Sequence, residues 1–206
     1  MALLDPSHPV HSAGRPLHVA VLDFWRWSGS DLLSNAQRGV LAEYLVGLAL
    51  SCITGVRTEW DPWDLVVGGV KVEVKSSAFV QSWDQRKPSK ARFDIKRTRI
   101  YDPKAASWVG EPRRHADIYV FALLSHRLKE TIDPLDVSQW EFFVVPTAAL
   151  DRDLGNAKTV GLAVLKRLAP TSVTWHALGD VVVSLTPTEP ASRNENVQVE
   201  VDDVDV

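Results

Sequence analysis

The sequence predicts an α/β fold of the α+β type, in which helices flank a mixed central sheet. Three observations support this prediction. The segment 35–50 is apolar at nearly every position from Gly39 onward, which is typical of a buried helix. Residues 64–75 form two apolar, β-branched runs around a Gly-Gly pair, which indicates an antiparallel hairpin. The segments 117–124 and 140–145 are almost continuously apolar, as expected for strands buried inside a sheet.

The first elements precede the hairpin. The aromatic-rich segment 19–33 is expected to form a helix, or a strand followed by a helix, with Phe24, Trp25 and Trp27 in the core. Ser34 or Asn35 is a suitable N-cap for the buried helix that follows.

Glu43 is the single charged residue in the apolar part of this helix. A buried carboxylate without a partner is costly, so it normally acquires a proton or a partner. Gly39 and Gly47 lie one turn on either side of Glu43, where missing side chains let the helix backbone approach a sheet. The alternative is a carboxylate that reaches past these small residues to water or to Arg38.

The register of the hairpin follows from counting outward from the Gly68-Gly69 turn. This count places Asp64 directly opposite Glu73, and Lys75 projects from the same face as Glu73. Directly opposed Cβ atoms lie about 4.5–5.5 Å apart, so the two carboxylates repel each other unless a cation lies between them. Mg²⁺ prefers such oxygen ligands, and the pattern therefore indicates a divalent metal site. The alternative is a solvated face with weak surface ion pairs.

Together, Glu43, Asp64, Glu73 and Lys75 resemble the conserved site of the PD-(D/E)XK nuclease superfamily, which has the restriction-endonuclease-like fold. The core of that fold is a helix with a Glu, then a hairpin with an Asp, then a Glu-x-Lys on the next strand. Glu43 matches the helix Glu, Asp64 matches the Asp, and Glu73 with Lys75 matches the Glu-x-Lys.

The resemblance has one visible departure, because the usual Pro immediately before the Asp is absent from the sequence Asp61-Pro62-Trp63-Asp64. Asp61 is therefore an alternative ligand, but the hairpin register favours Asp64. More loosely, the segments around Trp25, Trp83 and Trp140 are similar to those of small stand-alone bacterial members.

The resulting hypothesis is hydrolysis of DNA phosphodiesters with Mg²⁺ or Mn²⁺. Asp64, Glu73 and the backbone carbonyl of Val74 are expected to hold the metal ion, which polarises the phosphate and activates water. Lys75 is expected to position or help deprotonate that water and to offset transition-state charge. Glu43 is expected to bind a second metal ion or its hydration shell. The resemblance implies cleavage that leaves a 5′-phosphate.

The charge distribution makes DNA a plausible partner despite a formal net charge of −3 for the 206 residues. Residues from 194 onward hold five carboxylates and no Lys or Arg, so the rest of the chain has a net charge of +2. The segment 85–115 has ten Lys and Arg residues against three acidic ones, an electrostatic pattern suited to phosphate. The alternative is a solvated loop whose charges aid solubility. The candidate DNA-binding residues are Gln37, Arg38, Ser76, Lys87, Lys90, Arg92, Arg97 and Arg99.

The remaining elements complete the predicted domain, which spans residues 1–188 with an N-terminal helical extension. We expect a short strand over 91–95, a short helix capped by Thr147, a helix over 160–168 and a last ordered stretch over 173–185. Residues 189–206 are expected to form an acidic, disordered tail. This tail could instead compete with DNA for the basic segment, or add to a sheet as an edge strand.

Other site chemistries find little support. The six histidines lack zinc-ligand spacing, there is no Gly-rich phosphate loop, and no serine nucleophile motif is present. His115 and Asp117 could form a catalytic pair, but capping is the favoured role. Cys52 is expected to pack in the core. The N-terminus lacks the pattern of a signal peptide and no apolar run could span a membrane, so a soluble, cytoplasmic protein is expected, possibly a homodimer.

Two alternatives to a nuclease remain. One is a catalytically inactive DNA-binding module of the same fold, although all four site residues are intact. The other is a protein-interaction domain that uses the eight tryptophans.

Overall fold

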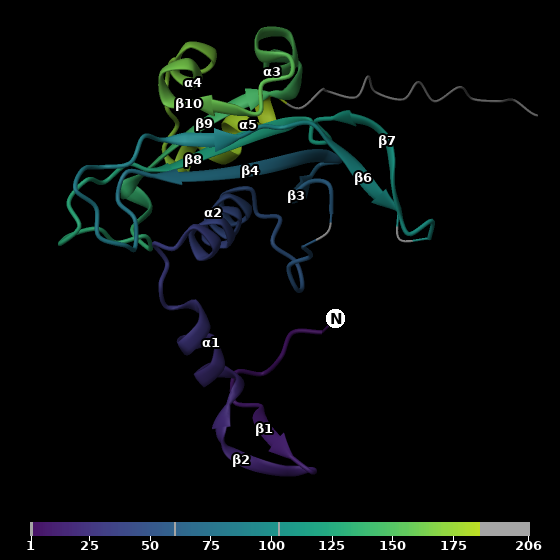
Figure 1. Ribbon diagram of the computed structural model, residues 1–206, viewed down its shortest axis with the longest axis vertical. Helices are drawn as coiled ribbons and strands as arrows, with labels where there is room; N and C mark the ends of the chain where they lie inside the picture. Colours follow the sequence, from purple (N-terminus) through teal and green to yellow (C-terminus); the bar gives the residue numbers. More distant parts are fainter. Residues whose placement is uncertain (1, 60, 103, 186–206) are drawn as a thin grey trace, which may run out of the picture.

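The centre of the protein is a mixed four-stranded sheet, seen in a computed structural model that describes residues 2–59, 61–102 and 104–185 (Figure 1). The strand order is β3-β4-β8-β9. β4 and β8 are parallel, whereas β3–β4 and β8–β9 are antiparallel. The prediction of a mixed sheet flanked by helices is confirmed. The strands are β3 (Leu65–Val67), β4 (Val70–Ala78), β8 (Ile118–Leu124) and β9 (Trp140–Pro146).

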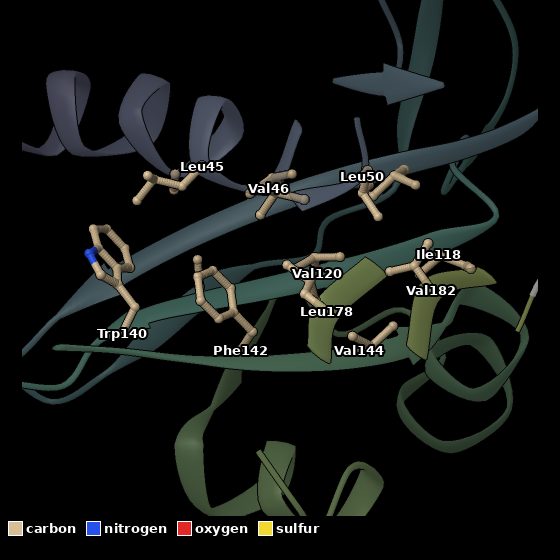
Figure 2. Packing of buried hydrophobic residues seen from close by; sticks show 14 of the residues in the cluster. Leu45, Val46, Leu50, Ile118, Val120, Trp140, Phe142, Val144, Leu178 and Val182 are labelled. Carbon is tan, nitrogen blue, oxygen red and sulfur yellow. The ribbon is translucent and has the colours of Figure 1, made fainter. Parts of the chain in front are cut away.

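One face of the sheet is covered by α2 (Asn35–Ala49) and α5 (Leu178–Ser184). Ser34 caps α2 as predicted, because its side chain accepts a hydrogen bond from the amide of Gln37. Alternate β4 residues point toward these helices. Figure 2 shows side chains from α2 and α5 meeting those of β8 and β9. This core orients α2, and therefore Glu43, against the sheet. The residues labelled there are Leu45, Val46, Leu50, Ile118, Val120, Trp140, Phe142, Val144, Leu178 and Val182.

The other face packs against α3 (Thr147–Leu154), α4 (Leu162–Leu168) and a small sheet of β5 (Arg92–Asp94) and β10 (Thr159–Gly161). The predicted strand over 91–95 is confirmed as β5. The predicted helix over 160–168 begins later, at Leu162, because residues 159–161 pair with β5. Thr147 does not cap α3: Pro146 is the N-cap, and the Thr147 hydroxyl donates to the carbonyl of Ala116 at 2.6 Å.

The N-terminal arm consists of β1 (Pro9–Ser12), β2 (Arg15–Ala20) and α1 (Val21–Gly29), and it lies apart from the central sheet (Figure 1). The predicted strand followed by a helix is confirmed, although a hairpin precedes the helix. The expected burial of its aromatic residues is wrong. Phe24, Trp25 and Trp27 are 56%, 40% and 84% exposed, because α1 contacts the adjacent β2 but lies apart from the central sheet (Figure 1).

The basic segment contains a further hairpin that the sequence did not indicate. β6 (Thr98–Asp102) and β7 (Ser107–Arg113) pair antiparallel and extend beyond the end of the central sheet (Figure 1). All seven β7 residues are exposed. Two short 3₁₀ turns, Val137–Gln139 and Trp175–Ala177, precede β9 and α5.

Two further predictions concern the ends of the chain and the membrane. Among the described residues, no helix is long and apolar enough to cross a membrane. The predicted acidic tail, residues 189–206, lies outside the described residues.

Candidate active site

The β3–β4 hairpin has the predicted register. Gly68 and Gly69 both have positive φ angles, +54° and +81°, which fits a primed two-residue turn and favours glycine at both positions. The ladder pairs Val67 with Val70, and it ends at the pair of Leu65 with Val72.

Asp64 lies immediately beyond the end of this ladder, so it does not form the predicted direct pair with Glu73. Its amide donates to the carbonyl of Val72 at 3.0 Å, and its carboxylate accepts the amide of Val74 at 2.7 Å. The preceding Trp63 lies under the ammonium of Lys71, 4.2 Å from the ring centre, and this contact helps to anchor the loop. Asp64 is thus held at the edge of β4.

The carbonyl of Val74 faces the same edge. In an antiparallel ladder, the N–H and C=O groups of one residue point to the same neighbour. The N–H of Val74 points to Asp64, so its carbonyl points to that side as well. Because β3 begins only at Leu65, opposite Val72, Val74 lies beyond the paired part of the hairpin.

The pKa of Asp64 is raised from 3.8 to about 7. Burial is the largest cause, followed by repulsion from Glu73 and then from Glu43. The hydrogen bond from Val74 and the charge of Lys75 favour the ionised form, but they do not cancel these effects. The surroundings of Asp64 therefore disfavour its ionised form.

Glu43 is paired with a residue that the sequence analysis missed. The Arg57 guanidinium forms a two-pronged ion pair with the Glu43 carboxylate, with Nη2 2.8 Å from Oε1. This hydrogen bond raises the pKa of Arg57. The charge of Glu43 is thus neutralised by Arg57, and not by Arg38, which was the alternative partner. One signal was available, because Arg57 is the only Lys or Arg between Arg38 and Lys71.

Glu73 and Lys75 lie on the opposite face of β4 from the α2 core and form an ion pair with each other. Burial disfavours the charge of Lys75, but the carboxylates of Glu73, Asp64 and Asp94 outweigh it and raise the pKa of Lys75. Lys75 is therefore held as an ammonium, which suits charge neutralisation better than proton abstraction. The neighbour of Glu73 in the parallel ladder is Tyr119, a site neighbour that the sequence did not indicate.

Two hollows contain the predicted site residues, and Asp64 lines only the larger of them. The larger, here called the Glu43 hollow, has a volume of about 390 Å³ and is lined by Glu43, Arg57, Asp64 and mainly apolar neighbours. The smaller, here called the Lys75 hollow, has a volume of about 70 Å³ and includes Glu73 and Lys75 in its lining. The two share no lining residue. The four predicted residues therefore do not line one pocket. They are related by charge, because Glu43, Glu73 and Lys75 all affect the pKa of Asp64.

The part of the chain that the structure describes contains no group of three His, Cys, Asp or Glu side chains placed to hold a metal ion. The ion pairs explain part of this result, since Arg57 holds Glu43 and Lys75 holds Glu73. Asp61, the alternative ligand, is exposed and accepts the hydroxyl of Thr58 at 2.6 Å.

Arg38 was predicted to contact DNA, and its burial disfavours that role. Arg38 is only 4% exposed. Its guanidinium donates to the carbonyl of Leu33 at 2.9 Å, to Gln81 at 3.1 Å and to Asn35 at 2.6 Å. It thus ties the start of α2 to the end of β4, where phosphate cannot reach it. Gln37 donates its side-chain amide to the carbonyl of Ser28 and links α2 to α1.

The basic segment divides into inward and outward side chains. Arg114 is buried and donates to Asp151 and to the carbonyls of Ile95, Gly155 and Ala157. Arg97 is half-buried and donates to Asp151 and Asn156, so it is less available to DNA than predicted. The remaining candidates are Ser76, which is half-buried, and Lys87, Lys90, Arg92 and Arg99, which are exposed.

His115 and Asp117 have separate partners. His115 Nε2 lies 2.6 Å from the carbonyl of Thr98, and its Nδ1 accepts from Arg113. Asp117 accepts the amide of Lys71 at 2.9 Å. These contacts support the capping role that the sequence favoured over a catalytic pair.

The two helix glycines differ from each other. A Cβ on Gly47 would collide with the side chain of Ile53 and would lie 3.3 Å from that of Leu65 in β3. This glycine therefore makes room both for the following loop and for the edge strand of the sheet, in agreement with the prediction. A Cβ on Gly39 would meet no atom within 4 Å, so no close approach requires a glycine there.

The chain matches no protein-family model, and no curated protein matches its sequence.

Proposed function

We propose that this protein is a metal-dependent nuclease that hydrolyses DNA phosphodiesters, with a restriction-endonuclease-like fold and a PD-(D/E)XK site. One observation carries the proposal. Asp64 is a half-buried carboxyl group beside β4, where desolvation and the charges of Glu73 and Glu43 raise its pKa and the charge of Lys75 opposes that rise. Strong pKa perturbation by burial and by specific neighbours is typical of functional sites.

The donor set suits Mg²⁺ or Mn²⁺. Magnesium is commonly bound by only one or two carboxylates, with water and substrate phosphate as its other ligands, so a three-carboxylate cluster is not required. Asp64, Glu73 and the carbonyl of Val74 would hold the ion, and the raised pKa of Asp64 marks negative charge that a cation would relieve. When bound, such an ion would polarise the phosphate and lower the pKa of water.

The other site residues have distinct roles in this proposal. The Lys75 ammonium, kept charged by its carboxylate neighbours, would neutralise charge that develops on the phosphate oxygens. Glu43 would act on the hydration shell of the ion or on a second ion. Arg57 would orient the Glu43 carboxylate, since two hydrogen bonds restrict its rotation.

The basic segment supports DNA as the substrate. Asp94, Lys96 and Thr98 line the Lys75 hollow, so the segment passes beside the proposed site. The exposed residues Lys87, Lys90, Arg92 and Arg99 would contact backbone phosphates, which provide affinity without reading sequence.

The direct test is incubation of the purified protein with linear, nicked, branched and single-stranded DNA, with and without Mg²⁺ or Mn²⁺. Cleavage should require the metal ion and should be lost in Asp64→Asn, Glu73→Gln and Lys75→Ala. Asp61→Asn is the matched control and should retain activity, because Asp61 is exposed and bonded to Thr58.

Two results would contradict the proposal. Metal-dependent DNA binding without cleavage of any substrate would favour the inactive DNA-binding module. Loss of activity in Asp61→Asn, with activity retained in Asp64→Asn, would show that Asp61 and not Asp64 is the site carboxylate.

A further inference from the structure

Two apolar surfaces on this chain lack a partner, and the first is the arm formed by residues 9–29. Its helix α1 has no buried residue. The exposed hydrophobic side chains of α1 are Leu22 (37%), Phe24 (56%), Trp25 (40%) and Trp27 (84%). This nine-residue amphipathic helix contacts the adjacent β2, and its first amides donate to the carbonyls of Pro6 and His8, but it buries no side chain. Such a helix is marginal in water, because most helix stability in proteins comes from tertiary packing.

The second surface is a stripe on the outer side of α2, here called the α2 stripe. It consists of Val40, Tyr44 and Leu48, which are 40%, 50% and 41% exposed and recur every fourth residue. The stripe continues into the Glu43 hollow, where Val40 and Tyr44 meet Ile53 and Val56. Exposed contiguous apolar surface of this kind marks an interaction site.

The arm of the same chain is held away from the α2 stripe. The Asp31 carboxylate accepts the amides of Leu33 and Ser34, each at 3.2 Å, and fixes the turn between the two helices. Gln37 bonds the carbonyl of Ser28 and anchors the end of α1 beside the start of α2. No arm residue lines the Glu43 hollow, and the arm points away from the body of the protein (Figure 1).

We propose that the protein forms a twofold symmetric dimer by reciprocal arm exchange, in which α1 of each copy packs on the α2 stripe and the apolar wall of the Glu43 hollow of the other. With twofold symmetry, each arm covers the α2 stripe of the other copy, so both apolar surfaces are covered in both copies. The assembly is closed at two subunits. The Lys75 hollow has different lining residues and stays open. This inference does not depend on nuclease activity.

The available area matches a stable dimer. The exposed fractions on α1 correspond to roughly 400 Å² of side chain per arm, taking about 200 Å² for a fully exposed aromatic residue. If each receiving surface covers an equal area, the two arms bury at most roughly 1,600 Å² in total. This value is the standard size of a specific protein interface, about 1,600 Å². The tryptophans are also the residue type most enriched among energetically dominant contacts.

The test measures the mass of the full-length protein by sedimentation over a range of concentrations. The arm variant carries Phe24→Ser with Trp27→Ser, and the stripe variant carries Val40→Ser with Tyr44→Ser. The control is Trp108→Ser on β7, which removes an exposed tryptophan outside both surfaces. The wild type and the control should be dimers, and each variant should raise the dimer dissociation constant on the order of 100-fold or more.

Mixing the two variants gives the sharper result. In a mixed dimer, the intact arm of the stripe variant meets the intact stripe of the arm variant, so one of the two contacts is restored. The mixture should therefore dimerise more tightly than either variant alone. Circular dichroism and melting temperature check that both variants fold, which is expected because all four substituted side chains are exposed.

Three results would overturn the proposal. The first is a monomeric wild type at tens of micromolar. The second is a dimer that the arm variant leaves unchanged. The third is a dimer that the arm variant disrupts and the stripe variant does not, which would indicate that two arms pair with each other.

Discussion

Removing the charge of Asp64 should stabilise the metal-free protein while abolishing its proposed activity. In Asp64→Asn, the amide oxygen can still accept the hydrogen bond from Val74, so the local geometry is retained. What disappears is a buried carboxylate whose ionisation is opposed by burial, Glu73 and Glu43. The substitution therefore measures how much the ionised Asp64 carboxylate lowers the free energy of unfolding.

The magnitude follows from linkage. The pKa of Asp64 is about 7 in the folded protein, against 3.8 as its ordinary value. Between these two pH values the folded state binds more protons than the unfolded state, so the wild type loses stability as pH rises. The full difference is at most about 4 kcal/mol and is reached above pH 7. A gain of roughly 2–4 kcal/mol in the free energy of unfolding is therefore expected at pH 8, and almost none near pH 4.

Thermal unfolding in EDTA measures this effect. For a protein of this size, 1 kcal/mol shifts the melting temperature by about 2–4 °C, so Asp64→Asn should melt roughly 5–15 °C above the wild type at pH 8. The gap should narrow as pH falls toward 4. Asp61→Asn serves as the control and should show no such pH-dependent gain. An Asp64→Asn protein that melts at or below the wild-type temperature at pH 8 would refute the assignment of unbalanced charge to this residue.

Three further predictions follow from other features. Millimolar Mg²⁺ or Mn²⁺ should raise the melting temperature of the wild type by mass action and should have a much smaller effect on Asp64→Asn; an equal shift in both would place the metal ion elsewhere. Arg114→Leu should lower the free energy of unfolding in urea by about 2–4 kcal/mol, because it removes the donor to three backbone carbonyls and Asp151, whereas Arg113→Leu on exposed β7 should change it by less than about 0.5 kcal/mol. Deleting residues 189–206 should tighten DNA binding most at low salt if the acidic tail competes with DNA; identical salt-dependent affinities would exclude that role.

Much of the scaffold could be predicted from local sequence, because its signals act over short distances. The Gly68-Gly69 pair and its flanking residues determine the turn and the register of the β3–β4 hairpin. Continuous apolar runs indicate the buried strands β8 and β9, and Ser34 marks the start of α2. Each of these features depends on local backbone preferences and on the spacing of apolar residues, and both can be read from the sequence.

What the tertiary structure alone decided is which side chains meet. Arg57 neutralises Glu43 from an irregular loop that has no periodicity to reveal its direction. Arg38 and Arg114 read as surface cations in the sequence, yet both are buried because carbonyl and carboxylate acceptors from distant segments surround them. Conversely, the aromatic residues of α1 read as core residues and are exposed, since burial depends on whether another element packs over them. Charge and hydrophobicity belong to the residue, but burial and pairing belong to the surroundings that only the folded chain provides.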